Sequence, residues 1–238
     1  MFIKSGFTYT FFRAMPLVFI VFLFSCNTNP DVNTIKEGEI EFEIDYLDSE
    51  RENPLISLLP RKMITEFKNN STNSIIVGFF GTFKLSYITN HNNGRNATLF
   101  QILDKKYMYE ADTSAAPFGY PDTTNVKIKY TGKTKKIAGY ICNHAIAVYS
   151  NTNDTVQLYY TKQLEIENPN SNNPYKQLKN VLLEFSVKMV GINMKFSAKK
   201  IKKIRVDKKK FDISKDYKKV SKSEMEKIVN EYNKMSGK

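Results

Sequence analysis

Apolar and polar residues alternate with a period of two along most of the chain, and this pattern predicts β-strands. Ile40, Phe42, Ile44 and Tyr46 alternate with acidic residues, which places the two sets on opposite faces of a strand. Further strands are predicted at 63–67, 98–103, 106–110, 126–130, 139–149 and 155–164, and a hairpin at 181–198. Residues 75–87 form a longer apolar run, and we expect one bent strand there because glycines 78 and 81 interrupt it.

Two segments have helical signals. Asn53-Pro54 can begin a helical turn near residues 54–59, which Pro60 ends. Near the C-terminus, Ser221 and Glu224 have the spacing of a capping box. The apolar face of that helix consists of Met225, Ile228, Val229, Tyr232 and Met235. The sequence therefore predicts a mainly β (α+β) fold: a strongly curved antiparallel sheet or incomplete barrel, a short helix near 54–59 and a C-terminal amphipathic helix.

The N-terminus has the features of an export signal. Lys4 and Arg13 precede the apolar run Ala14–Phe24, which is shorter than the roughly 20 residues of a membrane-spanning helix and suits a signal peptide. Leu23-Phe24-Ser25-Cys26 resembles a bacterial lipobox. The resemblance implies cleavage before Cys26 and acylation of its sulfur. The alternative is an uncleaved signal anchor.

This interpretation divides the chain into a lipoprotein signal peptide (1–25), a polar tether (26–35) and a single β-rich domain (36–238). An acylated Cys26 attaches the domain to a bilayer without spanning it, because each buried methylene of a lipid chain contributes about 0.8 kcal/mol. We expect a lipid-anchored protein of the bacterial cell envelope, at the outer membrane and facing the periplasm.

Composition and charge refine this picture. A hydrophobic content of 41% excludes a disordered chain. Nearly all of the net charge of +12 lies after residue 187, with the densest stretch in "KKIKKIRVDKKK" at 199–210. This stretch is either a patch for anionic lipid headgroups or, as we favour, the solvated face of an edge strand. The acidic residues at 39–45 neutralise it if the two strands are neighbours, and an exported protein has no access to nucleic acid.

Residues with catalytic or metal-binding potential are few. Cys142 and His144 share one face of a predicted strand, but a structural zinc site needs four ligands, so we expect no metal and no cofactor. With Cys26 acylated, Cys142 has no disulfide partner and is expected to be buried. No nucleophile elbow, phosphate-binding glycine loop or HExxH motif is present. We therefore assign no catalytic residue and expect no enzyme; a hydrolase with two converging carboxylates is a third possibility.

Two stretches carry a family resemblance: "KKIAGYICNHAIAVY" at 135–149 and "IKKIRVDKKKFDISKDYKKVSKSEME" at 201–226, with "NPLISLLPRKM" at 53–63 as further support. They resemble a group of bacterial outer-membrane or periplasmic lipoproteins. The matching positions are Gly139, Tyr140, Cys142, Asp207, Phe211, Ile213 and Tyr217, and Ser214 replaces a proline of the group's pattern. That group is similar in strand layout to the LolA/LolB-like fold, which implies a curved sheet whose concave side holds acyl chains.

Together these features predict a non-catalytic, lipid-anchored envelope protein that binds or transfers a lipid or other hydrophobic ligand in an apolar concavity. The expected lining residues are Phe42, Phe79, Tyr140, Leu158 and Phe185. The expected partners are the membrane, through acylated Cys26, and a hydrophobic ligand or an envelope protein. The alternative is a structural or interaction module of an envelope protein complex.

Overall fold

The computed structural model describes residues 1–2, 34–49, 56–78, 81–91, 94–112, 118–120 and 125–235. The chain divides into two units, Met1–Val32 and Asn33–Lys238, and every element below lies in the second. The predicted signal peptide, Cys26 and most of the tether lie outside the described residues.

Within the described residues, twelve strands form one sheet in the order β12-β6-β5-β4-β3-β2-β1-β11-β10-β9-β8-β7. The strands are β1 (Glu37–Tyr46), β2 (Lys62–Lys68), β3 (Ser71–Gly78), β4 (Phe83–Asn90), β5 (Arg95–Ile102), β6 (Lys105–Asp112), β7 (Val126–Ile137), β8 (Tyr140–Tyr149), β9 (Thr155–Thr161), β10 (Val181–Met189), β11 (Ile192–Lys202) and β12 (Lys218–Lys219). All neighbours are antiparallel except β12, which runs parallel to β6. The mainly β prediction is confirmed, and the sheet is open because its outer strands, β12 and β7, do not pair with each other.

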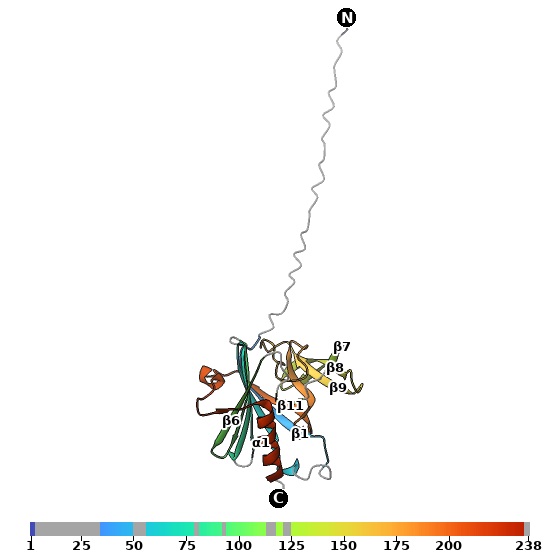
Figure 1. Ribbon diagram of the computed structural model, residues 1–238. Coiled ribbons are helices and arrows are strands. Elements are labelled where there is room, and N and C mark those ends of the chain that lie inside the picture. The colour runs from blue at the N-terminus through green and yellow to red at the C-terminus, as the bar shows by residue number, and fades with distance from the viewer. Residues whose placement is uncertain are drawn as a thin grey trace. The chain divides into compact units, whose positions relative to one another are not determined.

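The described residues contain three helical segments, and two of them coincide with a sequence signal. They are η1 (Ile56–Leu58), η3 (Lys208–Phe211) and α1 (Lys222–Met235). The predicted turn near 54–59 corresponds to η1, with residues 54 and 55 outside the described part. The predicted C-terminal helix corresponds to α1, which lies in front of the sheet between β6 and β1 (Figure 1).

The core lies on the face of the sheet that α1 covers. Ile40, Phe42 and Ile44 of β1 are buried there, as the alternation predicted, and Met225 and Val229 of α1 belong to the same cluster. A smaller cluster of Ile88, Ala97 and Leu99 lies on the opposite face, where Ile213 and Tyr217 pack against it. Residues after β11 therefore cross one face of the sheet before α1 returns to the other.

The apolar run 75–87 is not one bent strand. It contains the end of β3 and the beginning of β4, which pair antiparallel from Ser71↔Asn90 to Gly78↔Phe83. The chain reverses between Gly78 and Phe83, and Gly81 has φ +85°. The glycines thus mark a turn between two strands. Both strands carry apolar residues on the core face, so the apolar pattern of the sequence runs on from one strand to the next.

The lysine-rich stretch between the predicted strands 126–130 and 139–149 is not a separate turn. It continues β7 to Ile137, with a bulge between Tyr130 and Thr134. Gly132 lies in this bulge with φ +75°, a conformation that glycine adopts without steric cost. The reversal is a two-residue turn at Ala138-Gly139, both with positive φ, as hairpins with right-handed twist prefer.

The interpretation of residues 199–210 as part of an edge strand is wrong. Residues 192–202 form β11, which lies between β1 and β10 in the interior of the sheet. The expected neutralisation is confirmed, since Lys202 pairs with Glu39 at 2.6 Å and Lys199 pairs with Glu43 at 2.5 Å. The cross-strand acids of β1 allow these lysines to sit on a central strand.

Candidate ligand-binding site

The N-terminus of α1 fixes the helix against the sheet. The Ser221 N–H donates to a carboxylate oxygen of Glu224 at 2.8 Å, and the Glu224 N–H donates to the Ser221 Oγ at 3.2 Å. This is the reciprocal pair of a capping box. Val220 and Met225, on either side of the cap, are both buried, and the Val220 N–H donates to the Met108 carbonyl at 2.9 Å. The predicted cap thus joins α1 to the core and to β6.

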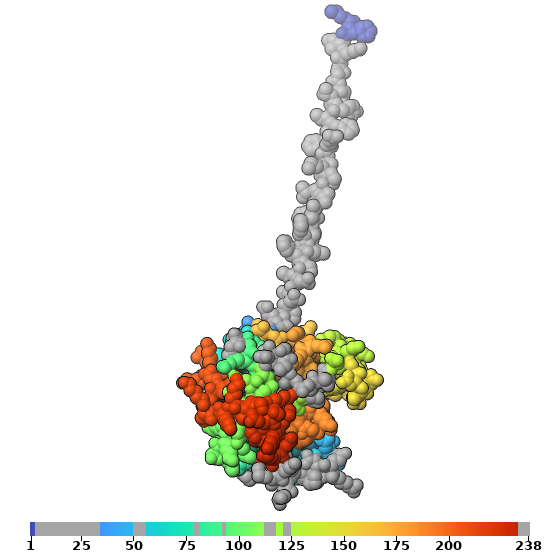
Figure 2. Space-filling view, viewed as in Figure 1, coloured from blue at the N-terminus to red at the C-terminus, as the bar shows by residue number. Residues whose placement is uncertain are grey.

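Beneath α1 lies an apolar cavity of about 110 Å³, called here the α1 cavity. Strands, η1 and α1 all contribute to its lining, which consists of Tyr46, Leu58, Leu59, Pro60, Ile76, Phe83, Leu85, Phe100, Phe118, Met189, Val190, Ile192, Met194, Val229 and Tyr232. The Tyr232 ring lies edge-on to Phe83 at 5.4 Å and to Phe100 at 6.1 Å between centroids. Edge-to-face aromatic contacts of this kind stabilise a packed pair by about 0.5–1.5 kcal/mol. In Figure 2, α1 (dark red) lies at the surface of the domain beside green and orange segments.

A second cavity of about 80 Å³ lies between the core face of the sheet and the loop before β10. Its lining is more polar, with Thr65, Ser74, Asn170 and Asn173 beside Phe42 and Phe185. The loop is held in place because the Asn170 amide donates to the carbonyls of Leu178 and Asn180 at 2.6 and 2.9 Å. A fixed loop therefore forms one wall of the second cavity, whereas α1 forms one wall of the α1 cavity.

Several tyrosine hydroxyls form hydrogen bonds inside the domain, and Tyr87 lines the second cavity. The Tyr87 hydroxyl lies 3.2 Å from the Met189 sulfur and donates to the Phe118 carbonyl at 3.4 Å, and the hydroxyls of Tyr149 and Tyr175 lie 3.2 Å apart. Burial raises the pKa of Tyr87 and of Tyr175 well above the ordinary value of 10. These hydroxyls stay protonated near neutral pH and act as fixed hydrogen-bonding groups.

The structure brings together only part of the predicted lining set. Phe42 and Phe185 meet edge-to-face at 6.1 Å and both line the second cavity. Leu158 is fully buried but lines neither cavity. Tyr140 is half-buried at the start of β8 and also lines neither. Phe79 lies outside the described residues.

The sequence reasoning missed Phe83, Phe100 and Tyr232, three of the aromatic residues that line the α1 cavity. Tyr232 was assigned to the apolar face of the helix, but the strands that this face covers could not be identified from the sequence. The usable signal was the alternation in β4 and β5, where Phe83 and Leu85 lie on the same face of the sheet as Phe100.

Cys142 is buried, as predicted, and His144 on the same strand is buried as well. His144 lies between the Thr131 hydroxyl, 2.7 Å from Nδ1, and the Gln157 amide oxygen at Nε2, with the Tyr159 ring at 4.7 Å. Burial raises the pKa of the Cys142 thiol to about 11. Among the described residues, no group of three or more His, Cys, Asp or Glu side chains could hold a metal ion.

Comparison with known proteins assigns the chain to a family of proteins defined by sequence. Residues 69–217 match the model of DUF4412, a domain of unknown function. The match covers more than half of the chain, and the chain belongs to this family. No curated protein matches its sequence.

Two solved structures of PNGF-II, in space groups P21 and C2, are similar to the chain in fold. They share 15% and 16% sequence identity with it, at TM-scores of 0.51 and 0.52 over 82% and 83% of this chain. The chain spans about a third of the length of PNGF-II, since 33% of that protein is covered. At this identity the likeness concerns the β-rich fold alone, and the LolA/LolB-like fold stays a prediction. In the part of the chain that the structure describes, no helix is long and apolar enough to cross a membrane.

Proposed function

We propose that this chain is a non-catalytic, lipid-anchored protein of the bacterial cell envelope that binds a hydrophobic ligand beneath α1. The observation that carries the proposal is the α1 cavity, which is lined almost entirely by apolar side chains and closed on one side by an amphipathic helix. Ligand pockets are typically apolar concavities with few polar groups. The lipobox at residues 23–26 supplies the anchor and the location in the envelope, and the resemblance to LolA/LolB-like proteins favours an acyl chain as ligand.

The volume of the cavity limits what it holds in this conformation. An apolar cavity of about 150 Å³ accepts a molecule of the size of benzene, and drug-sized ligands occupy about 300–1,000 Å³. At about 110 Å³, the α1 cavity takes the end of an acyl chain. A longer segment enters only if α1 moves away from Phe83 and Phe100, so binding of a whole chain is coupled to displacement of the helix.

The test is titration of the full chain with a fluorescent fatty acid. Val229→Phe places a ring in the α1 cavity, which Val229 lines, and we expect at least a tenfold loss of affinity. Val77→Phe is the matched control because Val77 is 50% exposed on β3 and lines neither cavity, and it should bind as the parent does. Equal affinity in all three proteins would contradict the proposal.

A second candidate is the interaction module of an envelope complex. It is favoured by an open groove of about 580 Å³ at the ends of β8 and β10, lined by Tyr149, Val187 and the exposed Leu47 among others. Protein contacts commonly form at surface grooves whose lining includes apolar side chains. Leu47→Glu should then abolish a cross-linked partner in envelope extracts without changing fatty-acid binding.

A further inference from the structure

The strand registers bring one end of every long strand together at the place where the β-rich domain begins, near Thr34. Glu37 of β1 is opposite Lys68 of β2, and Glu39 is opposite Lys202, the last residue of β11. On the other side, Val181 of β10 is opposite Thr161, the last residue of β9. The turn between β7 and β8, at residues 138–139, lies at this same end because Asn143 pairs with Tyr160. We call this the entry end of the sheet.

Gln163 connects the beginning of the domain to the β7–β8 hairpin. The Ile35 N–H donates to the Gln163 carbonyl at 3.0 Å, and the Ile141 N–H donates to the Gln163 side-chain oxygen at 2.9 Å. Thr34 lies eight residues after Cys26, a separation of at most about 28 Å for a fully extended chain. An acyl group on Cys26 therefore keeps the entry end close to the bilayer.

Several cations at the entry end form no ion pair within 4.0 Å with a carboxylate of the described residues. In the described part of the chain, none of the exposed side chains of Lys136, Lys162, Lys203 and Arg205 forms an ion pair. The acids nearby are engaged, since Lys36 binds Glu165, Lys68 binds Glu37 and Lys202 binds Glu39. Glu167 and Asp207 are exposed acids at this end, and Asp207 caps η3.

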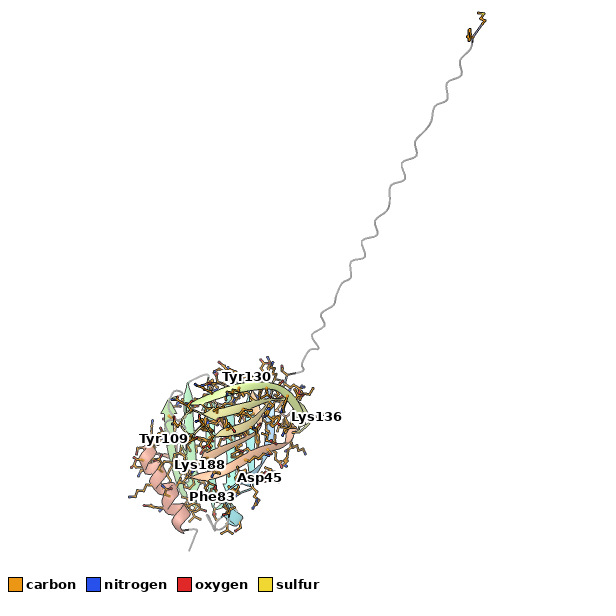
Figure 3. The ribbon with its side chains drawn as sticks, turned by 90° about the vertical axis from the view of Figure 1, so that its right-hand side faces the viewer. Asp45, Phe83, Tyr109, Tyr130, Lys136 and Lys188 are labelled. Atoms are coloured by element: carbon orange, nitrogen blue, oxygen red, sulfur yellow. The ribbon has the colours of Figure 1, made fainter. Side chains whose placement is uncertain are left out.

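Two large aliphatic side chains project among these cations. Ile141 is 61% exposed and lies directly opposite Lys136 in the hairpin, and Ile204 is 43% exposed between Lys203 and Arg205. Figure 3 shows Lys136 far from Asp45 and Phe83, which lie toward the other end of the strands. Exposed apolar residues flanked by lysine and arginine are typical of surfaces that lie in a membrane interface.

We propose that the entry end is a docking surface for an anionic bilayer, with Ile141 and Ile204 entering the interface and Lys136, Lys162, Lys203 and Arg205 binding lipid phosphates. Each cation near such a surface contributes about a fivefold increase in the docked population. In this orientation the α1 cavity, which reaches Tyr46 and Leu58 at the other end of β1, opens away from the membrane. The proposal deepens the proposed function and rests on acylated Cys26 only for the position of the tether.

The experiment uses the full acylated chain in lipid vesicles, with an environment-sensitive fluorophore at Ile141→Cys. Leu103→Cys is the matched control site because Leu103 is 67% exposed at the opposite end of the sheet. We expect the label at 141, and not at 103, to shift to shorter wavelength in vesicles that contain phosphatidylglycerol. The shift should be small in pure phosphatidylcholine and should disappear near 1 M salt, where the Debye length is about 3 Å.

A charge reversal tests the cations. Lys162→Glu with Lys203→Glu should lower the ratio of docked to undocked protein by about 25-fold or more, from two contributions of about fivefold each. Lys127→Glu with Lys129→Glu makes the same change in net charge on exposed positions of β7, and it should leave docking within about twofold of the parent protein. Equal losses in both pairs would overturn the proposal, because net charge rather than this surface would then decide binding.

Failures of the two proposals are distinguishable. If the intact mass shows the acyl group and the label at 141 stays in water in both kinds of vesicle, the docking surface is refuted and the anchor stands. If the acyl group is absent and the shift at 141 persists, the anchor is refuted and the docking surface stands. A shift produced by a soluble polyanion and not by vesicles would also refute a lipid surface.

Discussion

Replacing Ser221 with alanine tests whether α1 opens as a separate unit. The side chain of Ser221 accepts a hydrogen bond from the Glu224 N–H at 3.2 Å and contacts the Glu224 carboxylate at 2.9 Å. Loss of such a cap costs about 0.5–2 kcal/mol. The cap lies between the end of β12 and the beginning of α1, so we expect this cost to appear mainly as easier detachment of the helix.

The assay is native-state hydrogen exchange of the α1 amides. A cost of about 1–2 kcal/mol raises the open population by roughly 5- to 30-fold, since each 1.4 kcal/mol is a factor of ten. Amides of β1 and β11, in the centre of the sheet, should change far less, because local openings differ in free energy from global unfolding. Ser221→Thr keeps an oxygen acceptor and should exchange within about twofold of the parent protein.

Two results would refute this reasoning. Unchanged exchange in α1 would mean that the capping box does not hold the helix in place. An equal increase in α1 and in the central strands would mean that the helix opens only when the whole domain unfolds. In the second case the α1 cavity could not admit a ligand longer than its present volume allows.

Three further predictions follow from the core, the free thiol and the ion pairs. Leu158→Ala should lower the free energy of unfolding by about 2–5 kcal/mol in urea denaturation and leave fatty-acid binding unchanged, because Leu158 is fully buried and lines neither cavity. The native Cys142 thiol should react with iodoacetamide at least about 100-fold more slowly than in the unfolded chain, because its pKa rises from 9.0 to about 11. Equal rates would contradict this prediction and show that β8 opens at Cys142. Lys68 and the Val206 N–H lower the pKa of Glu37 from 4.5. The stability that Glu37 contributes is therefore present above pH 4.5 and is lost as the pH falls through its folded pKa. Glu37→Gln should flatten the pH dependence of the urea midpoint in that range, and an unchanged slope would contradict the assignment.

The sequence was most informative where a local pattern determined the structure by itself. The capping box at Ser221 and Glu224 depends on residues three apart, and it was found as predicted. The hairpin from β10 to β11 was equally clear because a period-two pattern continues on both sides of Gly191. In such cases the hydrogen bonds that define the element join residues that are close in sequence.

Prediction failed where strand order decided the outcome. The pairing of β11 with β1 joins residues that are about 160 positions apart, such as Glu39 and Lys202, and no local pattern shows which neighbour a strand has. The lysines of β11 were therefore read as an edge, although acids on β1 neutralise two of them. For the same reason Tyr140 and Leu158 were grouped with Phe42 and Phe185, whereas the registers place Tyr140 at the entry end.

Photo-crosslinking tests the central claim of a ligand site beneath α1 most directly. The full chain is incubated with a fatty acid that carries a photoreactive group at its methyl end, irradiated, digested and mapped by mass spectrometry. We expect adducts on the peptides that contain Phe83, Phe100 and Tyr232, and their loss in Val229→Phe. Adducts confined to the outer face of the sheet, or unchanged by Val229→Phe, would contradict the account.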